Sequence, residues 1–387
     1  MSNDHAPLAP SSAARWVQCP GSVVMSRAFP DDMSDPEASE EGTLAHAVAA
    51  GLLRALTSNT PAMDVGAFDA TPEATTCSSD EEMFEAVTLY VDRVRAAASQ
   101  PEHVELHVES KVTAPHIHSD NWGTPDAWLF NRAKMRLDVF DLKYGYGIVE
   151  VFENWQLLNY ASAIAHTLGL DTADTLLSVN LHIVQPRAYH RNGPVRSWSL
   201  SGEALRGYTN RLGRAASAAL MSGPNPECIT GDECRYCPAR HACPALLTVG
   251  YGAIESSGVS VPLDMPPAVM GMLLRQVRDG IKRLEAIETG LEQQALAAIR
   301  SGRRVSGWHA ESGAGRERWR VSYDEVLALG AAMGIEVAKP ALITPKQAVK
   351  AGLPREVVDC YTETPAGEVK LVADDGRLAC VFGKGAE

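Results

Sequence analysis

The chain has 387 residues, enough to bury a large core, which predicts two domains or one domain with an extension. Apolar residues make up 45% and charged residues 21%, as in an ordinary globular protein, and the net charge of −13 argues against broad, nonspecific coating of nucleic acid. The sequence has no apolar run of about 20 residues that could span a membrane and no signal-peptide pattern at its start, so we expect a cytoplasmic protein.

The N-terminal part predicts mostly helices. Ser11 or Ser12 can cap a short helix that ends before Pro20. Residues 31–41 are acidic and turn-rich, which predicts an exposed loop, and an Ala/Leu-rich helix follows over residues 42–56.

A loop, a helix and a strand are expected next. Residues 57–80 are small and polar and predict the loop, whereas residues 81–99 have the apolar spacing of a helix. Residues 104–112 alternate as a strand does. Glu109 on this strand is either an outward-facing charge at a sheet edge or part of a site.

The centre of the chain predicts a β-hairpin. Two segments rich in β-favouring residues, Thr124–Phe130 and Met135–Tyr144, are separated by four residues. Folding the hairpin brings Asp126 near Asp141, and the strand period of two places Asp141 and Lys143 on one face.

Two carboxylates and an ammonium at one end of a sheet indicate a metal site. Like charges this close raise the pKa of one carboxyl group unless a cation lies between them. A divalent ion held by Asp126 and Asp141 would supply that cation and leave positions for water and a phosphate oxygen. Lys143 would orient the attacking water or offset the charge on the pentacovalent phosphorus. Gln156 and Tyr160, four residues apart on a predicted helix, would hold a phosphate backbone. The alternative is a surface hairpin with solvated charges.

Residues 224–244 are rich in cysteine. Cys234, Cys237 and Cys243 have the spacing C-x2-C-x5-C, and three thiols so close in a cytosolic chain indicate a metal more than disulfides. A local zinc site would use Cys228 as the fourth thiolate.

The remaining elements are a strand, a linker and a C-terminal extension. The strand is predicted over residues 175–185, and the Gly-, Ser- and Pro-rich residues 251–266 predict the linker. A long amphipathic helix over 267–299, a basic hairpin over 301–322 and a small helix over 345–352 follow.

The motifs Gly-Thr-Pro-Asp (123–126), Asp-Leu-Lys (141–143) and Gln-x-x-x-Tyr (156–160) resemble the PD-(D/E)XK nuclease signature in its RecB- and AddB-like form. Most of the chain resembles a phage and prophage family of such nucleases that is known only as a domain of unknown function. The resemblance implies an α/β (α+β) fold with a mixed central sheet flanked by helices, a restriction-endonuclease-like core. The expected organisation is a nuclease core over 1–250, the linker over 251–266 and a helical and β extension over 267–387.

The same resemblance implies further ligands. His46, in Gly-Thr-Leu-Ala-His, matches an additional metal ligand of the family, and Glu109 matches a glutamate that precedes the hairpin. The implied ligands of Mg²⁺ or Mn²⁺ are His46, Asp126, Asp141 and the Leu142 carbonyl.

Relatives that contain an iron–sulfur cluster carry three cysteines after the core and a fourth in a Cys-Pro pair near the N-terminus. Cys19-Pro20 and the cysteines at 234, 237 and 243 match both halves of this pattern, which implies a [4Fe-4S] cluster. Structural Zn²⁺ is the alternative, because thiolates bind both metals.

These features predict a Mg²⁺- or Mn²⁺-dependent deoxyribonuclease. The expected activity is that of an exonuclease acting on single-stranded or duplex DNA ends. Basic residues that could guide a strand are Arg187, Arg191, Arg303 and Arg304. One departure from the family is Trp155, where proline is common. No motor motif is present, so a helicase or recombination partner would be a separate chain. The alternatives are a noncatalytic nuclease-like protein that binds DNA ends or acts as a scaffold, and a zinc-stabilised structural protein.

Overall fold

A computed structural model describes the protein over most of its length. The described residues are 6–29, 36–57, 81–99, 104–256, 265–314, 318–319, 321, 323–339, 341–342, 345–363 and 366–373. The chain divides into two compact units, one of Met1–Ala74 with Glu85–Leu291 and the other of Thr75–Phe84 with Glu292–Glu387.

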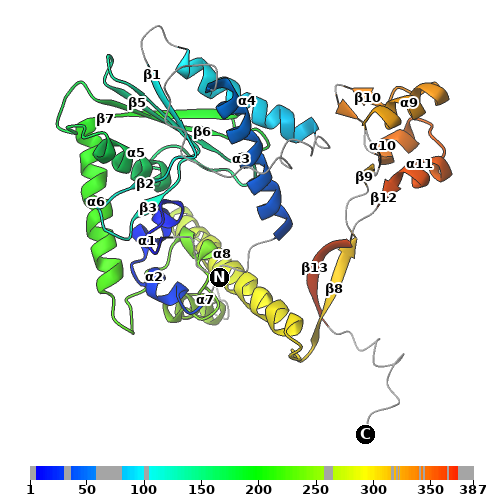
Figure 1. The fold of residues 1–387 in the computed structure, drawn as a ribbon. Helices are drawn as coiled ribbons and strands as arrows, with labels where there is room; N and C mark the ends of the chain where they lie inside the picture. The colour runs from blue at the N-terminus through cyan, green and yellow to red at the C-terminus, as the bar shows by residue number, and fades with distance from the viewer. Residues whose placement is uncertain are drawn as a thin grey trace. The chain divides into compact units, whose positions relative to one another are not determined.

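The first unit is built on a five-stranded sheet with the order β1-β4-β5-β6-β7 (Figure 1). Its strands are β1 (Val104–Val108), β4 (Ala127–Asn131), β5 (Arg136–Leu142), β6 (Ser178–Val184) and β7 (Val195–Ser201). β5 and β6 are parallel, whereas the other neighbours are antiparallel. A parallel pair requires a crossover, which here contains helix α5 (Trp155–Thr167). The expected α+β fold with a mixed sheet and flanking helices is confirmed.

One face of this sheet packs against α5 and α6 (Gly202–Met221), and the main core lies between them. Side chains alternate along a strand, so Leu137 and Val139 of β5 both enter this core. The same alternation puts Asp141 on the helix side at the end of β5, where Gln156 of α5 donates a hydrogen bond to it. The buried face of the sheet therefore leads directly to the charged residues at its end.

The N-terminal residues pack on the same helices. A short η1 helix (Pro10–Ser12) precedes α1 (Ala13–Gln18) and α2 (Gly21–Ser26), which contact α5 and α6. Trp16 of α1 is fully buried in the main core, and Cys19 follows at the end of the helix. Helix α3 (Pro36–Thr57) packs against β1, and α4 (Glu81–Ala98) belongs to this unit from Glu85 onward.

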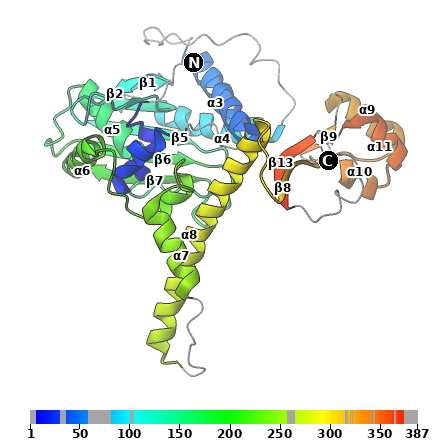
Figure 2. The ribbon, with the colours of Figure 1, turned by 90° about the horizontal axis from the view of Figure 1, so that it is seen from below.

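The first unit also contains small elements and a helical pair. These are β2 (Val112–Thr113), β3 (Trp122–Gly123), η3 (Asp232–Tyr236), α7 (Pro244–Ser256) and α8 (Pro267–Arg300), whose last residues belong to the second unit. Helices α7 and α8 run alongside each other (Figure 2). A Cβ at Gly250 would lie 2.5 Å from the Ile287 side chain, so glycine permits this close packing. No helix within the described ranges is both long and apolar enough to cross a membrane.

The second unit contains short strand pairs and three small helices. The elements are β8 (Trp308–Ala314), β9 (Arg318–Trp319), α9 (Tyr323–Met333), β10 (Ala338–Lys339), β11 (Ala341–Leu342), α10 (Pro345–Lys350), α11 (Arg355–Tyr361), β12 (Thr362–Glu363) and β13 (Ala366–Ala373). Val326, Val337, Ala348, Leu353 and Val358 form its small core.

Two expectations for the N-terminal half were wrong at element ends. The loop expected over 31–41 is partly helix, because α3 begins at Pro36; proline and the acidic residues after it suit the first turn of a helix. The strand expected over 104–112 stops at Val108 because Glu109 has φ of 48°, outside the strand region. The loop predicted over 57–80 lies almost wholly outside the described residues.

The C-terminal half differs more from the elements expected from the sequence. Strand β7 and helix α6 were not expected at all. The segment expected as a linker begins inside α7, which continues to Ser256. The hairpin expected over 301–322 is wrong: β8 pairs with β13, and β9 pairs with β12, so the strand partners lie about 50 residues away in sequence.

Candidate metal centre

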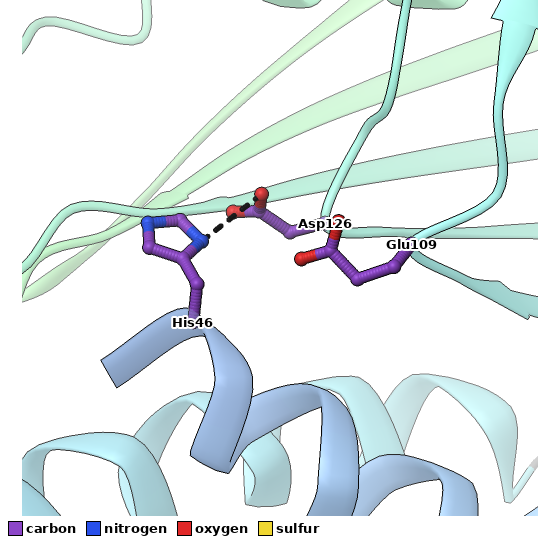
Figure 3. Close-up of side chains that lie close together, drawn as sticks. All are labelled: His46, Glu109 and Asp126. Carbon is purple, nitrogen blue, oxygen red and sulfur yellow. Dashed lines mark ion pairs between the residues drawn. The ribbon is translucent and has the colours of Figure 1, made fainter. Parts of the chain in front are cut away.

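Three residues from separate segments meet beside the end of the sheet (Figure 3). His46, Glu109 and Asp126 each offer one ligand atom, and these atoms lie within 4.8 Å of one another. His46 Nδ1 is 3.2 Å from Asp126 Oδ1. An imidazole nitrogen and two carboxylates at this separation suit a divalent cation such as Mn²⁺.

Backbone contacts hold these residues in place. The left-handed turn at Glu109 directs its N–H to the Asp126 carbonyl over 3.0 Å. Asp126, directly before β4, accepts a hydrogen bond of 2.6 Å at Oδ2 from the Leu142 N–H. Leu142 ends β5, so Asp126 is fixed against the end of the neighbouring strand. The predicted proximity of the two strand ends is thereby confirmed.

Asp141, Lys143 and Gln156 form a network next to this cluster. The Lys143 ammonium lies 3.0 Å from Asp141 Oδ2 and donates to Gln156 Oε1 over 3.1 Å. The Gln156 amide donates to Asp141 Oδ1 over 3.0 Å. Gln156 therefore orients both charged groups of the Asp-Leu-Lys motif.

Tyr160 lies one turn after Gln156 on α5 and contacts the loop that carries Asp126. It is buried, and its hydroxyl donates to the Thr124 carbonyl over 3.1 Å. A Cβ at Gly123 would lie 3.0 Å from the Tyr160 ring, so glycine lets the tyrosine approach this loop. Tyr160 therefore supports the Gly-Thr-Pro-Asp loop that carries Asp126.

The cluster concentrates negative charge. Burial and then the Asp126 charge raise the pKa of Glu109 to about 7. Burial also raises the pKa of Asp141, against the opposing effect of Lys143. Although burial lowers it, contact with Asp126 leaves the pKa of His46 above its usual value. A bound cation would stabilise the ionised form of these buried or partly buried carboxyl groups and offset the repulsion among them.

The Lys143 side chain is charged at neutral pH. Burial acts to lower its pKa, but the charges of Asp141 and Asp126 outweigh burial and raise the pKa above the usual value for lysine. A fixed ammonium beside the carboxylates is suited to stabilising an anion, such as a phosphate in a transition state.

One residue near the cluster was not recognised from the sequence. Tyr90 of α4 is buried, and among the described residues its hydroxyl has no hydrogen-bond partner. Burial, followed by the charges of Asp126, Glu109 and Asp141, raises its pKa well above the usual value. Its sequence signal was only a helical apolar position, which does not distinguish a core tyrosine from one that faces a site.

The loop after Lys143 is held by Gln185, which the sequence analysis also missed. Gln185 is fully buried and donates to the carbonyls of Gly145 and Gly147 over 2.9 and 2.7 Å. Its oxygen accepts from the Val149 N–H over 3.1 Å and from Arg196 over 2.7 Å. One side chain thus fixes the backbone that follows the Asp-Leu-Lys motif.

The basic residues expected to contact DNA differ from one another in their surroundings. The Arg187 guanidinium lies 4.4 Å from the Tyr144 ring and 4.3 Å from the Tyr146 ring, and it pairs with Glu41 of α3 over 2.9 Å. It therefore links the helix that carries His46 to the loop after Lys143. Arg191 is exposed between β6 and β7, whereas Arg303 and Arg304 are exposed in the second unit.

The predicted cysteines come together in a separate pocket. Cys19, Cys234, Cys237 and Cys243 line it, and Cys228 lines it as well. Cys19 Sγ accepts a hydrogen bond from the Ile229 N–H, and Cys234 Sγ accepts one from the Gly231 N–H, both at 3.3 Å. Backbone N–H groups directed at sulfur are typical of sites where a thiolate binds a metal.

A protein-family model with the description "Protein of unknown function (DUF2800)" matches residues 5–377. This match covers nearly the whole chain, so the protein belongs to the DUF2800 family.

Proposed function

We propose that the protein is a metal-dependent DNA nuclease that hydrolyses phosphodiester bonds, with strand ends as its expected substrate. One observation carries the proposal: five ionisable side chains from α3, the end of β1 and the β4–β5 hairpin gather at one end of the sheet. They are His46, Glu109, Asp126, Asp141 and Lys143. Gathering three carboxylates, one buried and two partly buried, is costly unless a cation binds there, which favours a role in binding and chemistry over a structural one.

His46, Glu109, Asp126 and Asp141 would hold Mg²⁺ or Mn²⁺, with the Leu142 carbonyl as a further ligand. A bound divalent cation would lower the pKa of a water molecule and polarise the phosphate. Lys143 would offset the negative charge that develops on phosphorus. Gln156 would fix the position of the Lys143 ammonium relative to the Asp141 carboxylate, since it forms hydrogen bonds with both.

The cysteine pocket would hold a [4Fe-4S] cluster with a structural role. The cluster would join the end of α1 to the segment around η3, because Cys19 and the three later cysteines line one pocket. The pocket is formed by residues other than those of the His46 cluster, so its metal would support the fold without taking part in hydrolysis.

The test is a cleavage assay with end-labelled single-stranded and duplex DNA, in the presence of Mg²⁺ or Mn²⁺. Wild-type protein should cleave both or one of these substrates, and Asp126→Asn and Lys143→Met should lose cleavage while remaining folded by circular dichroism. Asp92→Asn is the matched control, because Asp92 is an exposed aspartate of α4 paired with Arg95.

DNA binding without cleavage by wild-type protein, with either metal, would instead support the noncatalytic scaffold. Full activity in both site variants would refute the assignment of these residues.

A further inference from the structure

The cysteine pocket contains one thiol more than a metal site needs. Five cysteines line it: Cys19, Cys228, Cys234, Cys237 and Cys243. A [4Fe-4S] cluster and a structural zinc ion each take four thiolates. One of the five thiols is therefore left over whenever such a metal is bound.

Three of the ligands are determined by the local chain. Cys234, Cys237 and Cys243 lie within ten residues, in and directly after η3. The fourth ligand must come from outside this segment, and the pocket offers two candidates. They are Cys19 at the end of α1 and Cys228 in the segment that precedes η3.

The two candidate thiols are neighbours. Cys19 and Cys228 both line the pocket. Ile229, the residue after Cys228, donates its N–H to Cys19 Sγ over 3.3 Å. Cys19 and Cys228 therefore occupy adjacent positions on the wall of the pocket.

The backbone around both cysteines is tightly packed. The Gly21 N–H donates to the Glu227 carbonyl over 3.2 Å. A Cβ at Gly21 would lie 2.5 Å from that carbonyl oxygen and 2.9 Å from Cys228 Sγ. Glycine is required for this close approach, so the segment of Cys228 is fixed against the start of α2, two residues after Cys19.

We propose that Cys228 is an alternative fourth ligand of the metal in this pocket, able to replace Cys19. The inference rests on the proposed binding of metal by the cysteine pocket and is independent of the nuclease chemistry. The pocket would then keep its metal after loss of either Cys19 or Cys228, but not after loss of both. Whichever thiol is not bound remains beside the metal, where it can take over the ligand position.

The experiment uses the full chain, purified without oxygen, as wild type, Cys19→Ala, Cys228→Ala and the double variant. Cys360→Ala is the matched control, because Cys360 is exposed and lies in the second unit. Iron, acid-labile sulfide and zinc are measured per chain, together with the visible spectrum and the electron paramagnetic resonance of the reduced protein. Circular dichroism reports folding, and reconstitution with iron and sulfide tests variants that lose metal during purification.

Each single variant should keep at least about half of the wild-type metal, and the double variant less than about a tenth, because three thiolates bind far more weakly than four. The resonance of reduced Cys19→Ala should also differ from wild type, since one ligand has changed. The same pattern in zinc would support ligand replacement and refute the cluster.

Two results would overturn the inference. In the first, folded Cys19→Ala loses as much metal as the double variant. In the second, folded Cys228→Ala does so. Wild-type protein without iron or zinc, even after reconstitution, would refute metal binding by the pocket altogether, whereas DNA cleavage would be judged separately.

Discussion

Asp126→Asn should change the stability of the protein in opposite directions at low and high pH when the carboxylate site has no metal. Asp126 Oδ1 lies 3.2 Å from His46 Nδ1, and a Glu109 oxygen lies within 4.8 Å of the other two ligand atoms. Asparagine has the same shape and can still accept the hydrogen bond from the Leu142 N–H, so the substitution mainly removes charge.

The sign follows from the protonation states. At about pH 6, below the pKa of about 7 of Glu109, this carboxyl group is mostly neutral, while contact with Asp126 favours charged His46. The substitution then removes an attraction and should destabilise the protein. At about pH 8.5 Glu109 is ionised, so the substitution removes a repulsion between two carboxylates and should stabilise the protein.

Charges 4.8 Å apart interact by roughly 3.5 kcal/mol at an effective dielectric constant of about 20, which is an upper limit for this partly exposed group. Allowing for solvent, we expect a change of about 1 kcal/mol in each direction. Urea unfolding in the presence of EDTA, monitored by tryptophan fluorescence at both pH values, measures this change in the free energy of unfolding.

Addition of Mn²⁺ provides a second readout on the same two proteins. The free energy of unfolding of the wild type should increase by about 2.7 kcal/mol at a Mn²⁺ concentration of 100 times Kd, whereas that of Asp126→Asn should hardly change. An equal loss of stability at both pH values, or an equal response to Mn²⁺, would refute the electrostatic account of the cluster.

Four other outcomes are expected. Lys143→Met should lower single-turnover DNA cleavage by about 100-fold or more while keeping Mn²⁺ stabilisation at about pH 8.5, because the ammonium lies beside Asp141 without being a metal ligand. Stabilisation by Mn²⁺ should increase from about pH 6 to 8, since the Glu109 carboxyl group, with a pKa of about 7, must lose its proton to bind metal; calorimetry in two buffers should detect the released proton. Without metal the dependence is opposite: a carboxyl pKa raised from 4.5 to about 7 removes up to roughly 3 kcal/mol of stability as the pH rises through that interval. Gln185→Ala should destabilise the first unit by roughly 3 kcal/mol in urea unfolding, because it breaks buried hydrogen bonds and removes a partner of Arg196.

Each of these has a contradicting result. Undiminished cleavage by Lys143→Met would remove the lysine from the reaction. A Mn²⁺ response that is independent of pH, with no proton released, would show that Glu109 is not a ligand. Metal-free stability that rises between about pH 4.5 and 7 would contradict the raised pKa of Glu109. A change in stability below about 0.5 kcal/mol for Gln185→Ala would mean that water replaces its hydrogen bonds.

The strand and helix that carry the central motif could be predicted, because their signals are local. The hairpin needs only two β-favouring segments with a short connection, and the sheet confirms it as β4 and β5. Its geometry then brings Asp126 to the end of β5, as expected. The helix expected to carry Gln156 is likewise confirmed as α5, and the Asn154 side chain caps its first turn.

Features that depend on distant contacts could not be predicted. The turn at Glu109 requires an unusual φ, and no residue type in its neighbourhood signals it. The pairing of β8 with β13 joins strands that are separated in sequence by α9, α10, α11 and the short strands β9 to β12. The hydrogen bond from Tyr160 to Thr124, beside a glycine that permits the close approach of its ring, joins residues 36 positions apart and has no local signal.

The hydrogen bond between Ile229 and Cys19 joins residues that are 210 positions apart. During synthesis, the first helices emerge long before the segments on which they pack, including α6 and the cysteine segment. Trp16 therefore remains exposed to solvent until the ribosome has made more than half of the chain. A nascent chain that ends early would lack α6, on which its first helices pack, and the cysteines that follow α6. We therefore expect such fragments to need chaperones or to be degraded.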